Sequence, residues 1–190
     1  MDYGRRLAHV SGVAVPGLYL VGLVEWQTIR YLVAAGAAVA VVLEFFRLFV
    51  GLDWVVYDRL TREYEQDNPA GYALAVVSAA IVAWVFEPAI AVAAMLLLAI
   101  ADPLAGVLSE AEGPDTRKSY GVMMVTFAVC VLIALPFLPP RAVFPVAAVV
   151  VAADALKPRV YGFVIDDNFS IPVGAAVTAW LLATYVPPLV

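Results

Sequence analysis

The sequence predicts an all-α, polytopic integral membrane protein with about seven transmembrane helices, folded as a single transmembrane domain over residues 1–190. Three observations predict this fold class: the composition, the division into apolar segments, and the distribution of positive charge between them. Of the 190 residues, 64% are hydrophobic and only 14% are charged. Soluble globular domains are about 45–50% apolar and about 25% charged. The composition therefore argues against an ordinary soluble domain.

Charges, prolines and glycines divide the chain into seven apolar segments. A bilayer core of about 30 Å needs about 20 helical residues, and fewer where a segment is kinked or re-entrant. The third and sixth segments are the shortest, and no soluble domain or repeat separates any two of them. The segments are Leu7–Val24, Ile29–Val50, Gly71–Phe86, Pro88–Leu108, Tyr120–Leu138, Ala142–Leu156 and Ile171–Val190.

Positive charge alternates between the connections of this seven-span arrangement. Only Arg30 and Arg141 fall on one side. Because cytoplasmic loops are enriched in Lys and Arg, we expect a cytoplasmic N-terminus and an external C-terminus in the cell membrane. The net charge of −5 argues against nucleic acid as a partner. The nine basic residues on the other side are Arg5, Arg6, Arg47, Arg59, Arg62, Arg117, Lys118, Lys157 and Arg159.

The first two segments each carry polar residues at their cytoplasmic ends. Arg6 and His9 begin the first segment and are candidate phosphate-binding groups, although the arginines could instead contact lipid headgroups. Glu44 and Arg47, three residues apart, can pair on one helix face. A buried pair contributes little by itself, so Arg47 is either a structural partner of Glu44 or a phosphate ligand.

The fourth segment contains Asp102 within an apolar run. A carboxylate at the centre of a membrane helix costs about 2.5–3.5 kcal/mol on insertion scales, which makes it a functional candidate. Pro103 interrupts the helical hydrogen bonds beside it, which a membrane tolerates only against protein or water. Lys118, Ser119 and Gly121 follow after an acidic connection, and this basic, hydroxyl and glycine combination suits a phosphate.

Acidic residues return near the cytoplasmic ends of the last two segments. Asp154 lies near the end of the sixth segment, and Asp166, Asp167 and Asn168 directly precede the seventh. Carboxylate and amide oxygens are ligands for hard cations such as Mg²⁺. We therefore predict metal ligation by Asp102, Asp166, Asp167 and Asn168. The alternative for the Asp-Asp-Asn group is a helix N-cap and turn.

Four pieces of the chain, in order and spanning most of its length, match one known pattern. They resemble the membrane-integral dolichol kinase and phytol kinase family, which is related to CTP-dependent lipid cytidylyltransferases. The chain departs from the family pattern at Ala101, at Ser109-Glu110 and at Asp154, where Gly, Gly-Arg and Glu are usual. The matching pieces are Arg5-Arg6-Leu7-Ala8-His9, Asp102-Pro103-Leu104-Ala105 with Gly113, Lys118-Ser119-Tyr120-Gly121, and Asp166-Asp167-Asn168-Phe169-Ser170-Ile171-Pro172.

The resemblance implies transfer of the γ-phosphate of CTP to the hydroxyl of an isoprenoid alcohol, such as dolichol or polyprenol, at the cytoplasmic membrane face. Mg²⁺ held by Asp102 and the Asp-Asp-Asn group would bridge phosphate oxygens. Lys118 and Ser119, with Arg47, would bind the triphosphate. Either Asp154 or Asp166 would accept the hydroxyl proton as the general base.

Two other functions remain open from the sequence. A lipid cytidylyltransferase that releases pyrophosphate needs much the same groups. A small transporter or channel would instead line its pathway with Asp102 and Glu44. The sequence is compatible with a homo-oligomer.

Overall fold

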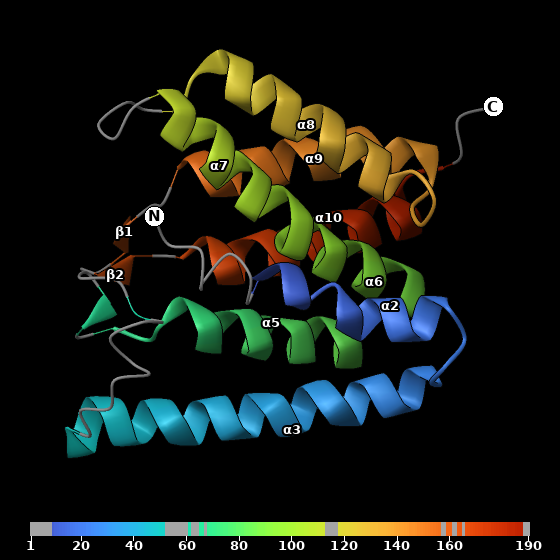
Figure 1. Ribbon diagram of the computed structural model, residues 1–190. Helices are drawn as coiled ribbons and strands as arrows, with labels where there is room; N and C mark the ends of the chain where they lie inside the picture. The colour runs from blue at the N-terminus through green and yellow to red at the C-terminus, as the bar shows by residue number, and fades with distance from the viewer. Residues whose placement is uncertain are drawn as a thin grey trace.

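A computed structural model describes residues 9–51, 61, 65–66, 68–112, 118–156, 159–160, 163–164 and 166–187, and this part of the chain is predominantly helical (Figure 1). Two short antiparallel strands, β1 (Arg159–Val160) and β2 (Phe163–Val164), pair with Arg159 opposite Val164. The helices in chain order are α2 (Ala14–Leu20), α3 (Trp26–Phe45) continued by the π-helix η1 (Phe46–Val50), α5 (Gly71–Val85), α6 (Pro88–Leu96) continued by the π-helix η3 (Leu97–Ala101) and α7 (Asp102–Glu112), α8 (Tyr120–Ala134), α9 (Pro140–Ala155) and α10 (Asp167–Tyr185).

Local sequence signals set where several helices begin. Pro88 and Pro140 open α6 and α9, at positions where a missing N–H leaves no helical bond unmade. Ser119 caps α8 by accepting a hydrogen bond from the backbone N–H of Val122 at 3.2 Å. Asp166 caps α10 in the same way. These caps place Lys118 and Asp167 directly beside helix N-termini.

The helices pack side by side in the order α3, α5, α10, α9 and α8. The continuous rod of α6, η3 and α7 runs obliquely across them and contacts α5, α8 and α10 (Figure 1). Residues 90–99 of this rod are all buried, and a helix that is buried all round lies at the centre of its fold. The rod therefore forms the core of the bundle and also carries Asp102.

The outer faces of the bundle are apolar. Phe49 on η1, Leu132 on α8 and Phe144 on α9 are all more than half exposed. Glu44, Asp154 and Asp167, in contrast, are buried. Large exposed apolar surfaces mark contacts with a membrane or with another protein, so these outer faces are candidate contact surfaces of that kind.

Within the described part of the chain, two helical stretches are long and apolar enough to cross a bilayer, Trp26–Val50 and Pro88–Glu110. Three other helices, α5, α8 and α9, have 15, 15 and 16 residues. At 1.5 Å per residue they are about 22–24 Å long, less than the hydrocarbon thickness of about 30 Å. The seven-span arrangement and its orientation stay predictions.

The last helix begins four residues earlier than the predicted Ile171, at Asp167. Pro172 lies inside α10 and has no N–H to donate to the carbonyl oxygen of Asn168. The hydroxyl of Ser78 on α5 donates to that carbonyl at 2.9 Å. A side chain from a neighbouring helix thus replaces the missing bond, which sequence periodicity alone does not show.

We expect Leu97→Ala to lower the free energy of unfolding by about 2–5 kcal/mol, because the fully buried Leu97 side chain would leave a cavity beside η3. The matched change Leu132→Ala, on the exposed face of α8, should alter it by no more than about 0.5 kcal/mol. Unfolding of the detergent-purified protein measures both. Equal losses would contradict the assignment of core and outer face.

Candidate functional site

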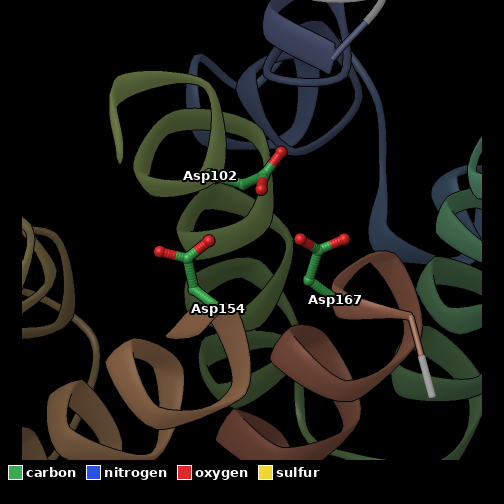
Figure 2. Close-up of side chains that lie close together, drawn as sticks. All are labelled: Asp102, Asp154 and Asp167. Atoms are coloured by element: carbon green, nitrogen blue, oxygen red, sulfur yellow. The ribbon is translucent and has the colours of Figure 1, made fainter. Parts of the chain in front are cut away.

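Three carboxylates from three helices gather at one place in the bundle. Asp102 begins α7, Asp154 lies near the end of α9 and Asp167 begins α10. One ligand oxygen from each lies within 4.8 Å of the others. Figure 2 shows the three side chains directed toward a common space between their helices. We call these three residues the acidic cluster.

The π-helix η3 sets the position of Asp102. It spans Leu97–Ala101 and ends at the residue before Asp102. Pro103 cannot donate a hydrogen bond to Ala99, so regular α-helical bonding is interrupted where η3 lies. Single π-helical turns within α-helices often occur at functional sites. The interruption expected at Pro103 is therefore present, and it precedes the carboxylate directly.

Among the residues that the structure describes, two basic side chains contact the acidic cluster. The Lys118 ammonium forms an ion pair with Asp154 Oδ1. His9 Nδ1 lies 3.3 Å from Asp102 Oδ2. Lys118 and His9 were both expected at a phosphate site, and the structure places each against a different carboxylate. Arg6, the other basic candidate of the N-terminal motif, lies outside the described residues.

The Asp-Asp-Asn group divides between two tasks. Asp167 belongs to the acidic cluster. Asp166 instead caps α10, because its Oδ1 accepts hydrogen bonds from the backbone N–H and the side-chain Nδ2 of Asn168, at 3.0 and 2.6 Å. Asp166 and Asn168, both predicted to bind the metal, are thus not among the three grouped carboxylates. Asp166 instead acts as the helix N-cap, which was the alternative interpretation.

Asn168 anchors the start of α10 to α5. Its backbone carbonyl accepts from Ser78, and its Nδ2 approaches Gly71 so closely that a Cβ there would lie 2.6 Å away. Asn168 is 2% exposed, and its Oδ1 has no hydrogen-bond partner among the described residues. The contacts of Ser78 and Gly71 with Asn168 were not predicted from the sequence. The sequence shows these two residues only as a hydroxyl and a glycine in a mainly apolar helix.

Ser119 and Gly121 lie at the beginning of α8, next to Lys118. Ser119 caps the helix, and Gly121 is exposed in its first turn. The expected phosphate-binding group therefore coincides with a helix N-terminus, where backbone N–H groups favour an anion. Phosphate binding by Ser119 and Gly121 stays a prediction.

Arg47 is fully engaged in a network of its own. Its Nε and one Nη donate to the two carboxylate oxygens of Glu44 at 3.0 and 2.7 Å. The remaining donors bind the backbone carbonyls of Glu65, Gln66 and Asn68, at 2.6–3.1 Å. A guanidinium has five N–H donors, so none is left for a phosphate unless one of these bonds breaks.

Glu44 is satisfied as completely as Arg47. Besides the guanidinium, it accepts from the backbone N–H of Ala70 at 2.9 Å and from the hydroxyl of Tyr72 at 2.6 Å. The pair therefore fastens the segment before α5 to the end of α3. This geometry supports the structural interpretation of Glu44 and Arg47.

The acidic cluster fits a small divalent cation. In an octahedral Mg²⁺ site with metal–oxygen distances of 2.0–2.1 Å, opposite oxygens are about 4.2 Å apart. One oxygen of each carboxylate lies within 4.8 Å of the others. At most one pair of three ligands can be opposite in an octahedron, so the other pairs would have to close to about 2.9 Å around the ion. All three donors are hard carboxylate oxygens, which this cation prefers.

Comparison of the chain with protein-family models, with curated proteins and with solved structures gives no match.

We expect Arg47→Ala to destabilise the protein by about 3–5 kcal/mol, because it leaves the buried Glu44 carboxylate without its cation. Unfolding in detergent measures the loss. Arg30→Ala is the control, because the Arg30 side chain makes one long-range hydrogen bond, to Ala83, and a cation–π contact with Trp84, and should cost only about 1–2 kcal/mol. If Arg47→Ala left unfolding unchanged and only weakened nucleotide binding, Arg47 would be a phosphate ligand.

Proposed function

We propose that this protein is a CTP-dependent kinase that transfers the γ-phosphate to the hydroxyl of an isoprenoid alcohol such as dolichol or polyprenol. The observation that carries the proposal is the convergence of Asp102, Asp154 and Asp167 from three helices, with Lys118 beside them. The four motifs of the chain supply the reaction class by resemblance. Phosphoryl transfer depends mainly on positioning and on charge neutralisation, and this site offers groups for both.

Each group has a role that follows from its position. Asp102 and Asp167 would hold Mg²⁺, which neutralises charge on the phosphate oxygens when bound. Lys118 is within reach of the same space through its contact with Asp154. The N-terminus of α8, which begins after Ser119, would add backbone N–H donors for the triphosphate. Arg47 has no role in binding.

The transfer breaks the bond between the γ-phosphorus and the oxygen that bridges to the β-phosphate, and CDP leaves. A new bond forms between that phosphorus and the alcohol oxygen, whose proton passes to a carboxylate. Of the two bases suggested by the sequence, Asp154 lies in the acidic cluster, whereas Asp166 caps α10. We therefore assign Asp154 as the proton acceptor.

The proposed enzyme is a multi-pass protein of the cell membrane with its site at the cytoplasmic face. The apolar outer surface and the two long apolar helices support membrane insertion. The excess of Lys and Arg on one set of connections supports the orientation. An alcohol dissolved in the bilayer meets an aqueous nucleotide only at such a face.

Asp102→Asn and Asp167→Asn should each reduce transfer of γ-labelled phosphate from CTP to a polyprenol by about 100-fold or more, since each removes a charge that balances the cation. Thin-layer analysis of the lipid products measures the transfer. Glu87→Gln, an exposed acid in the turn before α6, is the matched control and should keep full activity. Full activity in folded Asp102→Asn and Asp167→Asn proteins would refute the site.

Label placed at the α-phosphate of CTP separates the proposed kinase from a cytidylyltransferase. A kinase leaves α-label in CDP and transfers only γ-label to lipid. Incorporation of α-label into lipid, with release of pyrophosphate, would replace the proposed reaction with nucleotidyl transfer at the same site.

Orientation can be tested with single cysteines in a Cys130→Ala background, since Cys130 is fully buried. We expect Glu25→Cys and Glu87→Cys to react with an impermeant maleimide added outside intact cells. Glu110→Cys, at an exposed position on α7, should react only after permeabilisation. Reaction of all three from outside would contradict the cytoplasmic placement of the site.

A further inference from the structure

An apolar cavity of about 240 Å³ lies next to the acidic cluster. Its walls come from α2, α3, α5, α6, η3 and α10, and it reaches His9 at one edge. Because His9 Nδ1 is 3.3 Å from Asp102 Oδ2, one side-chain contact connects this edge of the cavity to the acidic cluster. The proposed roles of the cluster leave the cavity itself without a function.

The cavity walls offer little to a polar ligand. Besides His9, the polar residues that line it are Tyr72 and Ser78. The Tyr72 hydroxyl donates to Glu44 at 2.6 Å, and the Ser78 hydroxyl donates to the carbonyl of Asn168 at 2.9 Å. Both hydroxyl protons are thus directed to protein acceptors. An apolar cavity larger than about 150 Å³ can take up a hydrocarbon and remain dry.

Small side chains create this space. Ala75 and Ala79 on α5 and Ala99 on η3 line the cavity, as does Gly12. The same π-helix that ends at Asp102 therefore supplies part of the wall. A ligand held against η3 lies on the helical turn that precedes the carboxylate.

Size limits what the cavity can hold. Pockets for drug-sized ligands are usually about 300–1,000 Å³, and this one is smaller at about 240 Å³. It can enclose only a short hydrocarbon segment. The rest of a long chain would have to leave the cavity and lie along the apolar outer surface.

We infer that this cavity binds the hydrocarbon segment adjacent to the hydroxyl of the acceptor alcohol, and that its alanines select for that segment. The inference rests on the proposed kinase function for the identity of the ligand. The cavity holds the first part of the chain, so that the hydroxyl lies at the His9 edge near Asp102. Recognition therefore depends on the chain near the hydroxyl and hardly on total chain length.

Photolabelling tests the cavity without any catalysis. The probe is a radiolabelled farnesol analogue with a diazirine on its second isoprene unit, added without nucleotide to the full-length protein in nanodiscs. We expect the label within 72–79 of α5 or 95–99 of α6 and η3. Ala79→Phe should reduce labelling and raise the KM for the alcohol by about tenfold or more, with the KM for CTP unchanged. Ala38→Phe, at an exposed alanine of α3, is the control and should change neither.

A second variant guards against misfolding of Ala79→Phe. Val76→Ala enlarges the same cavity and should improve kcat/KM for an alcohol that carries an extra methyl branch near the hydroxyl. Label located elsewhere, or wild-type labelling in a folded Ala79→Phe protein, would overturn the inference. Preferential labelling by a diazirine-bearing diacylglycerol would do the same, since it assigns the cavity to acyl chains.

The two proposals fail separately. If the cavity is labelled but no phosphate reaches any alcohol, the kinase proposal fails and the hydrocarbon site stands. If γ-phosphate is transferred while the label maps outside the cavity, the kinase proposal stands and the cavity assignment fails.

Discussion

Burial of carboxylates inside an apolar helix bundle is the constraint on which this structure depends. An isolated charge in such surroundings costs far more than a typical protein's stability, so each acid needs partners. The bundle supplies them from elements distant in sequence: Lys118 for Asp154 and His9 for Asp102. The acidic cluster therefore fixes how the beginning of α8, the end of α9 and the rod of α6, η3 and α7 sit relative to one another.

The bundle holds buried acids in two different ways. Glu44 has a bidentate guanidinium, a backbone N–H and a tyrosine hydroxyl around it, and Arg47 has no donor to spare. Such a closed network stabilises one arrangement of helices. In the acidic cluster, three carboxylates from separate helices face one another instead. A bound cation would offset the mutual repulsion of these three charges. The closed network of Glu44 and Arg47 is therefore typical of a structural pair, whereas the three facing carboxylates are typical of a binding site.

Sequence analysis located the acids of the site because a charge in an apolar run is conspicuous, as for Asp102 and Asp154. It could not separate Asp166 from Asp167, since adjacent residues differ by about 100° around a helix and the start of α10 decides which one caps. The partners of Arg47 are backbone carbonyls, which any sequence would supply. Likewise, Ala75 and Ala79 look like packing alanines, and only the assembled helices show that they border a cavity.

The π-helix η3 makes the orientation of Asp102 depend on the number of residues that precede it in the helix. A π-turn behaves as one extra residue in an α-helix, and each residue turns the helix by about 100°. The direction of the Asp102 carboxylate is thus encoded by the number of residues between Leu96 and Asp102 as well as by the aspartate itself. Inserting or deleting one residue within Leu97–Ala101 would therefore turn the Asp102 carboxylate away from the acidic cluster, although none of these five residues carries a polar side chain.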